Sequence, residues 1–170
     1  EFAEKFPSYI FLDLMGMPHD MLPDFLEWER QLLRAEDPRE KVGALKSVIE
    51  YLENFLDGQR ANPTTELMKN IVTAQYEGER PLTKDEMMGM ITLLYIGGLD
   101  TVYSSLGWIF RHLAADQALQ ERLRANPEQI PWAMEEFLRV YPVAQPHRKI
   151  KQDIVFHGVP MRKGDHVLMA

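Results

Sequence analysis

The sequence predicts a mainly α protein with one long central helix and a small antiparallel β-sheet near its C-terminus. Two observations support this prediction. From the N-terminus to about residue 143, apolar residues recur at helical spacing in segments that proline and glycine separate. After Pro146 the pattern changes to short β-branched and aromatic runs, separated by Gly158 and by Gly164-Asp165, which is typical of antiparallel strands.

Four helices are expected before the central one. Their predicted ranges are 3–18, 23–35, 37–61 and 64–78. The third has the clearest start, because Asp37 is a capping acid, Pro38 suits the first helical position and Glu40 lies in the first turn. The fourth helix is expected to close at Gly78.

The central helix is expected over residues 81–115, and Thr83 and Glu86 form a capping box at its start. Through most of its length Asp100 is the only charged residue. A helix that is apolar all round is either buried in a domain or spans a membrane. Because a carboxylate at mid-span is costly in lipid, we expect a central, buried helix.

Two more helices are expected to follow the central one, over residues 116–125 and 126–143. Strands are then expected over residues 154–156 and 166–169.

The composition excludes several kinds of site. The net charge of −7 argues against a nucleic-acid surface, which needs clustered lysine and arginine. The chain has no cysteine, which excludes disulfides and thiolate metal ligands within it, and the five histidines show no metal-binding spacing. The lack of cysteine fits an intracellular protein, no signal peptide is visible, and the expected location is the cytoplasm.

The first candidate site is the run Gly97-Gly98-Leu99-Asp100-Thr101 inside the central helix. Glycine in a helix interior costs roughly 0.5–1 kcal/mol relative to alanine, so this pair needs a reason. One interpretation is a close helix crossing. The other is a locally opened helix, where the Thr101 hydroxyl turns inward to leave room for a ligand and a buried Asp100 relays protons.

The second candidate is the pair Glu136 and Arg139, which share one helix face at i, i+3. A pair on the surface would contribute little to stability. The apolar neighbours Phe137, Leu138 and Val140 favour burial instead, and we therefore expect a buried structural lock.

The third candidate is His147-Arg148, at the entry to the strands. It is either a solvated basic turn or a guanidinium fork aimed at carboxylates.

In their order and spacing, three stretches together resemble one known family. YIGGLDTV (95–102), EEFLRVYPVAQPHR (135–148) and FHGVPMRKGDHVLM (156–169) are similar to the cytochrome P450 haem-thiolate monooxygenases, most of all the soluble bacterial camphor 5-monooxygenase subfamily. The resemblance implies a partial cytochrome P450 fold. Residues 1–170 would be an internal fragment, the central part of a single domain without its N-terminal helices and its C-terminal haem-ligand loop.

The resemblance also implies roles for the residues of the first candidate site. Thr101 would hold the oxygen species at the iron by hydrogen bonds, and Asp100 would supply protons to it from solvent. The oxygen and substrate pocket would be lined by Leu93, Ile96, Gly97, Gly98, Val143 and Ala144.

The other candidates would bind the cofactor or support the fold. Arg148 would pair with a haem propionate, whereas Glu136 and Arg139 would be structural. Pro146 stands where the camphor enzyme has an acid, so the propionate network would differ. The family's iron ligand is a cysteine thiolate, and this chain has none, so no metal ligand is expected in it.

The function implied for the parent enzyme is haem-dependent hydroxylation of a small apolar substrate, such as a terpenoid or a small aromatic. Haem b, dioxygen and electrons from NAD(P)H through a ferredoxin-type redox partner would be required, with no nucleic-acid or membrane partner. The fragment alone is expected to be inactive and, with its haem-side apolar face exposed, to self-associate. A helical protein-interaction module without haem and a membrane-anchored helical protein are the alternatives.

Overall fold

The computed structural model describes residues 2–169. Their helices are α1 (Phe2–Met15), η1 (His19–Met21), α2 (Leu22–Arg34), α3 (Pro38–Ala61), α4 (Glu66–Thr73), α5 (Lys84–Ala115), α6 (Gln117–Ala125), η2 (Pro127–Gln129) and α7 (Ile130–Val140). Their strands are β1 (Gln75–Tyr76), β2 (Arg80–Pro81), β3 (His147–Lys149), β4 (Ile154–Phe156), β5 (Val159–Met161) and β6 (His166–Leu168). The mainly α prediction with a small antiparallel sheet region is confirmed.

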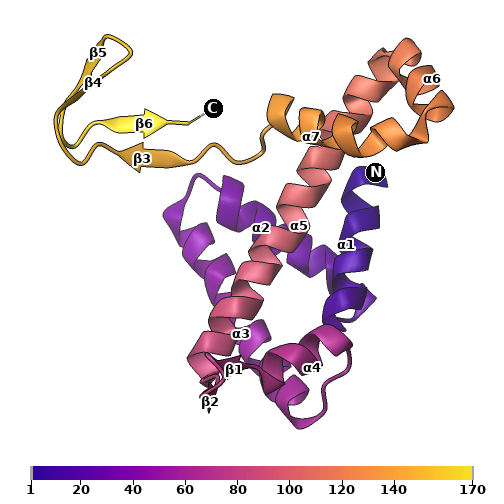
Figure 1. Cartoon of the computed structure of the whole chain (residues 1–170). Helices are drawn as coiled ribbons and strands as arrows, with labels where there is room; N and C mark the ends of the chain where they lie inside the picture. Colours follow the sequence, from indigo (N-terminus) through magenta and orange to yellow (C-terminus); the bar gives the residue numbers. More distant parts are fainter. Residues whose placement is uncertain (1, 170) are drawn as a thin grey trace. The chain divides into compact units, whose positions relative to one another are not determined.

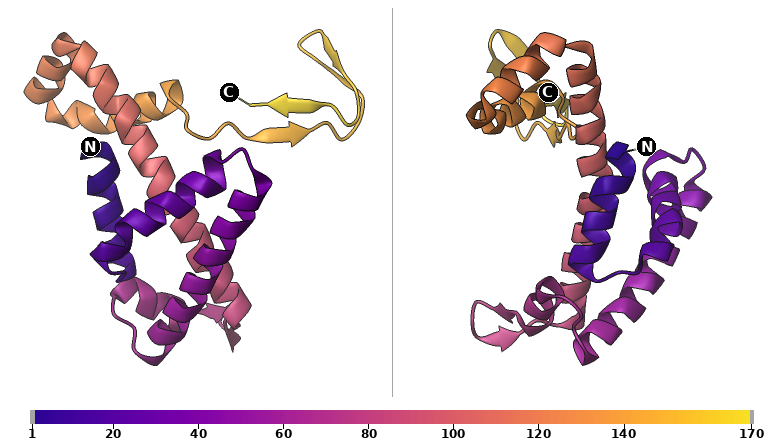
Figure 2. Two further views of the ribbon diagram at one scale, coloured as in Figure 1. Left: turned by 180° about the vertical axis from the view of Figure 1, so that it is seen from behind. Right: turned by 90° about the vertical axis from the view of Figure 1, so that its right-hand side faces the viewer.

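The chain divides into two compact units, Glu1–Leu106 and Gly107–Ala170. In the first, the helices α1 to α4 gather around the first part of α5 (Figures 1 and 2). The core of this unit consists of Phe11, Leu12, Met15, Met17, Leu22, Phe25, Val48, Leu52, Leu56, Met68, Ile71, Met87, Ile91, Tyr95 and Leu99. Burying one such large side chain stabilises a fold by roughly 1.5–3 kcal/mol.

The long helix α5 is buried along one stripe and not all round. Met87, Ile91, Tyr95 and Leu99 recur at four-residue spacing and are almost fully buried. The opposite side is open in this chain, and Leu93 has 72% of its surface exposed. The expected central helix is therefore present with one face buried, while its opposite face is exposed because packing partners among the described residues cover only one side of α5.

The predicted helix starts are confirmed at α3 and α5. The Asp37 carboxylate accepts a 2.8 Å hydrogen bond from the amide of Arg39. At α5 the Glu86 carboxylate accepts from the Thr83 amide at 2.8 Å, and the Thr83 hydroxyl accepts from the Glu86 amide at 3.3 Å. Each bond satisfies a backbone N–H that the helix leaves without a partner.

The fourth predicted helix ends earlier than expected. Helix α4 stops at Thr73, and β1 and β2 then form an antiparallel hairpin. Glu77 (φ 50°) and Gly78 (φ 77°) form its turn. Both belong to the three-residue loop 77–79 between the paired residues Tyr76 and Arg80, so Gly78 is a turn residue and the expected closure of a helix there is wrong.

The second unit contains α6, α7 and the C-terminal strands. Strand β3 pairs with β6, and β4 pairs with β5 across a turn at His157-Gly158. The strands predicted at 154–156 and 166–169 are confirmed, and β3 and β5 are their partners. None of the helices within residues 2–169 is long and apolar enough to cross a membrane.

Candidate functional site

The glycine-rich run of α5 lies in a continuous helix. The Thr101 hydroxyl donates a 2.5 Å hydrogen bond to the carbonyl of Gly97, and Ser105 repeats this pattern on Thr101 at 2.8 Å. The predicted local opening of the helix is therefore wrong for this structure. The physical reason is that a threonine hydroxyl reaches the carbonyl four residues earlier without breaking the helix.

The two glycines have different surroundings. A Cβ atom at Gly98 would lie 2.3 Å from Cδ2 of Phe11, so the ring of Phe11 fits here only because residue 98 has no side chain. A Cβ at Gly97 would meet nothing within 4 Å. Close packing against α1 thus explains Gly98, although the neighbour is a side chain and not a second backbone. Within residues 2–169, Gly97 has no such packing reason.

Gly97 belongs to the open face of α5. Leu93, Gly97 and Thr101 follow one another at four-residue spacing and so share a side of the helix. Leu93 and Ile96 also line a shallow hollow of about 490 Å³ between α5 and α3, with Ile49 on its other side. Four of the predicted site residues therefore lie on one largely apolar, uncovered face.

Asp100 points to a different side, toward α2. Its carboxylate accepts a 2.7 Å hydrogen bond from the Arg34 guanidinium, and its side chain keeps only 23% exposure. The same guanidinium donates to the Tyr103 hydroxyl at 2.5 Å. Successive helix residues do not face each other, which separates Asp100 from Thr101 in this arrangement. The prediction had placed them in one relay but had not identified Arg34 as the partner.

Glu29 on α2 is a neighbour of Asp100 that the sequence argument missed. Its Oε1 accepts a 3.0 Å hydrogen bond from the backbone amide of Asp100, and only 4% of the residue is exposed. Burial raises the pKa of Glu29 to about 7 and outweighs the hydrogen bond from the Asp100 amide, which lowers it; the negative charge of Asp100 raises it further and the positive charge of Arg34 lowers it. The sequence held a signal, since Glu29 lies on the apolar stripe of α2 at helical spacing from Phe25 and Leu32.

The predicted site residues of the second unit lie on exposed chain. Val143 and Ala144 are exposed, and so is Arg148, which lies in β3 opposite Val167. The Arg148 guanidinium donates to the carbonyl of His147 at 2.9 Å. The exposed guanidinium keeps further N–H donors with which to bind a carboxylate. The approach of Val143 and Ala144 to the α5 face stays a prediction.

The expected burial of Glu136 and Arg139 is wrong for this structure. The two side chains form a bidentate pair at 2.8 and 2.6 Å but are 60% and 70% exposed. The neighbour Phe137 is buried, whereas Leu138 and Val140 are exposed as well. Apolar neighbours therefore did not indicate burial, because only one of them faces the interior of this unit.

A second pair in the chain has the same geometry. Arg30 binds Glu27 on α2 at 2.8 and 2.6 Å, also at i, i+3 and on the surface. The local geometry of the Glu136–Arg139 pair is therefore not distinctive.

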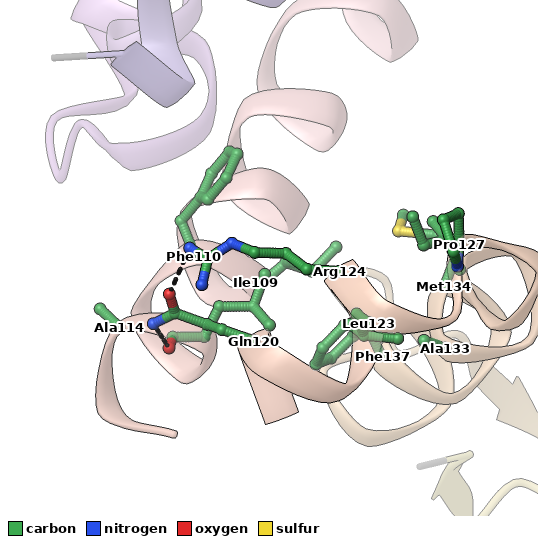
Figure 3. Close-up of a pocket in the computed structure, with 12 residues that line it drawn as sticks. Ile109, Phe110, Ala114, Gln120, Leu123, Arg124, Pro127, Ala133, Met134 and Phe137 are labelled. Atoms are coloured by element: carbon green, nitrogen blue, oxygen red, sulfur yellow. Dashed lines mark hydrogen bonds between the residues drawn. The ribbon is translucent and has the colours of Figure 1, made fainter. Parts of the chain in front are cut away.

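The second unit also contains an apolar pocket that the sequence argument did not identify (Figure 3). It has a volume of about 540 Å³ and lies among α5, α6 and α7. Its polar rim is Gln120, which donates to the carbonyl of Leu113 at 2.5 Å and accepts from Arg124 at 3.0 Å. Beside it the Tyr141 hydroxyl lies 2.7 Å from Nδ1 of His112, which joins the end of α7 to α5.

The described residues include no group of three or more histidine, aspartate or glutamate side chains that could hold a metal ion. With no cysteine in the sequence, no residue of this chain can supply a thiolate ligand. What the chain does offer is the open α5 face, where Gly97 leaves space for a planar apolar group, and the exposed guanidinium of Arg148.

Comparison with known proteins gives a consistent result. A family model described as Cytochrome P450 matches residues 12–170. The curated protein "Probable cytochrome P450 127A1" of Sinorhizobium fredii is 34% identical over 167 residues, which cover 98% of this chain and 40% of its own length. The "Vitamin D(3) 25-hydroxylase" of Pseudonocardia autotrophica is 28% identical, over 99% of this chain and 42% of its own.

Solved structures agree with these matches. The crystal structure of CYP101J2 superimposes with a TM-score of 0.76 at 33% identity, over 98% of this chain and 41% of that one. The cytochrome P450 PksS of Bacillus subtilis gives a TM-score of 0.85 at 27% identity, over 99% and 44%. The chain thus spans about two fifths of the length of the proteins it matches.

Proposed function

This chain belongs to the cytochrome P450 family, and from that membership we propose that it is the central part of a single cytochrome P450 domain in a haem-dependent monooxygenase. The observation that carries the proposal is the α5 face, where Gly97 lies open beside the Thr101 hydroxyl and the exposed apolar side chains Leu93 and Ile96. Such a face suits a flat apolar cofactor and a small apolar substrate.

Each unit offers a group that suits part of a haem, but neither can bind its iron. The open space at Gly97 suits a flat macrocycle, and the exposed Arg148 guanidinium suits a carboxylate substituent, which a guanidinium binds in a bidentate manner. The thiolate ligand would come from a part of the protein that this chain does not contain. When bound, haem b would activate dioxygen for insertion of one oxygen atom into the substrate.

Thr101 and Asp100 are proposed to move protons. The Thr101 hydroxyl donates a hydrogen bond to the Gly97 carbonyl, which leaves the lone pairs of the Thr101 oxygen as acceptors on the open face. Asp100 has a carboxylate that can carry a proton, but Arg34 holds it on the α2 side. Transfer of a proton from Asp100 to Thr101 therefore requires that the Asp100 carboxylate leave the ion pair with Arg34.

The remaining roles follow the same proposal. Leu93, Ile96 and Gly97, together with Val143 and Ala144, would form the oxygen and substrate pocket. Gly98, which the sequence had placed in it, packs against Phe11 instead and is left out of the proposal. The substrate would be compact and apolar, terpenoid-like or a small aromatic. Electrons would come from NAD(P)H through a ferredoxin-type partner in the cytoplasm, and Glu136 and Arg139 would be structural.

The test is the spectrum of the reduced, carbon-monoxide-bound whole protein. The expected result is a Soret band at the position specific for thiolate-ligated haem. A protein that binds no haem at all would instead support the alternative, a helical interaction module in which Asp100 and Thr101 are only packing residues.

A further inference from the structure

Glu29 is an acidic group in an environment that disfavours charge. It lies on α2 with 4% of its surface exposed, and its Oε1 accepts the backbone N–H of Asp100 at 3.0 Å. An amide in the middle of an α-helix ordinarily donates only to the carbonyl four residues earlier. This contact therefore attaches a carboxyl group of α2 to the backbone of α5 at the residue that carries the proposed proton donor.

When Glu29 is ionised, Glu29 and Asp100 share one cation. The titratable and charged groups near it are Arg34, Glu27 and Arg30 of α2, Asp100, Tyr103 and Tyr95 of α5, and Glu4 of α1. Arg34 is the cation that acts on both Glu29 and Asp100. A protonated Glu29 leaves one carboxylate for that guanidinium, whereas an ionised Glu29 leaves two.

A route for the proton is also present. A cavity of about 270 Å³ lies between α1, α2 and α5, and both Glu29 and Asp100 line it. Its remaining walls include Arg34 and Tyr103, so it is polar and large enough for several water molecules. Glu29 can therefore lose its proton to water in this cavity and regain it from there.

We propose that Glu29 is a positioning residue for the monooxygenase reaction. It exchanges one proton with water in the cavity, and its charge determines whether the Arg34 guanidinium binds Asp100 alone or is shared between Asp100 and Glu29. Ionised Glu29 repels the Asp100 carboxylate and competes for its cation, which frees Asp100 to turn toward Thr101. The inference rests on the proposed function, but the titration of Glu29 itself does not depend on haem.

Infrared spectroscopy of the whole, haem-loaded protein tests the titration. The wild type should show the carbonyl band of a buried carboxylic acid that fades as the pH rises through about 7. Glu29→Gln keeps the acceptor for the Asp100 amide but should lack this band. Glu27→Gln is the matched control on the same helix, because the Arg30 guanidinium lowers the pKa of Glu27 to about 2 and the band should persist.

The second measurement is how tightly NADH consumption is coupled to product formation. Product formed per NADH should change with pH through the same range in the wild type and in Glu27→Gln, and should be flat in Glu29→Gln. If Glu29→Gln does not fold, Arg34→Gln replaces it and should move the band's midpoint to higher pH by removing a nearby positive charge.

The inference is overturned if Glu29→Gln keeps the band or if its coupling profile matches that of the wild type. If either result occurs in a protein with a normal thiolate Soret band, the inference fails but the proposed function stands. If the whole protein binds no haem, the proposed function fails, and the same infrared titration of the haem-free protein still tests Glu29.

Discussion

The ring of Phe11 on α1 occupies the space where Gly98 of α5 lacks a side chain. A Cβ at Gly98 would lie 2.3 Å from Cδ2 and 2.5 Å from Cε2 of that ring. Phe11 is itself a buried core residue, so it has little room to move away. Experiments can therefore distinguish the roles of the two neighbouring glycines: Gly98 makes room for packing, whereas Gly97 lies on the open face of α5.

Gly98→Ala should destabilise the protein by roughly 1–3 kcal/mol, because the added methyl group overpacks the core against Phe11. Thermal unfolding measures the loss. Phe11→Leu combined with Gly98→Ala should recover part of it. Strict additivity of the two substitutions would contradict the contact.

Gly97→Ala is the matched control and should behave in the opposite way. Its methyl group meets nothing within 4 Å, so the helix should gain roughly 0.5–1 kcal/mol from the better helix former. In the whole enzyme the same methyl group would intrude on the oxygen side, and product formation should fall. A stabilised variant with full activity would remove Gly97 from the proposed pocket.

Thr101→Ala should uncouple turnover without abolishing it, because the hydroxyl steers protons while electron delivery and substrate binding use other groups. NADH consumption should continue as product falls and peroxide rises. Thr101→Ser keeps the hydroxyl that bonds to Gly97 and should retain most of the coupling. An unchanged product yield per NADH in Thr101→Ala would count against its assignment.

Asp100→Asn should slow turnover with coupling largely kept and with a larger solvent isotope effect. The amide preserves the shape of the side chain but cannot take up and release a proton as a carboxylate does. It also loses the charge that binds Arg34, so thermal stability must be recorded in parallel. Kinetics like those of the wild type would show that Asp100 only joins α5 to α2.

Replacement of Glu136 or Arg139 by alanine should have different effects in two contexts. In the 170-residue chain neither change should alter thermal unfolding, because both side chains are on the surface. In the whole protein each should lower haem content per folded chain, if the remainder of the domain supplies the partners of the pair. Glu27→Ala and Arg30→Ala, with the same geometry, should leave haem content unchanged. Near-normal haem in all four variants would contradict the structural role.

Glu29→Gln should remove a fall in stability with rising pH. Burial raises the pKa of Glu29 from its ordinary value of 4.5 to about 7, so the folded state keeps this proton between those values and the unfolded state does not. The free energy of unfolding then decreases by on the order of 3 kcal/mol as the pH rises through this window, and it stays constant above the window. Denaturation of both proteins across the window measures the difference. Parallel curves would show that Glu29 does not titrate there.

The sequence predicted what depends on local spacing. The capping groups Asp37 and Glu86 set the starts of α3 and α5 because they satisfy amides of their own helices. The order of the helices and the strands at 154–156 and 166–168 also follow from local pattern. Burial was harder to predict, because Leu138 and Val140 are as apolar as Phe137 and yet only Phe137 faces inward.

The sequence by itself therefore determined the order of the main helices, the capped starts of α3 and α5, the position of the glycine-rich run and the family signature that contains Asp100 and Thr101, but not the β1–β2 hairpin. Only the tertiary structure decided that the ring of Phe11 packs against Gly98 while Gly97 stays open. It also decided that Asp100 binds Arg34 beside a buried Glu29. These contacts join residues more than 60 positions apart. No local periodicity encodes such pairs, since the packing of whole helices selects which side chains meet.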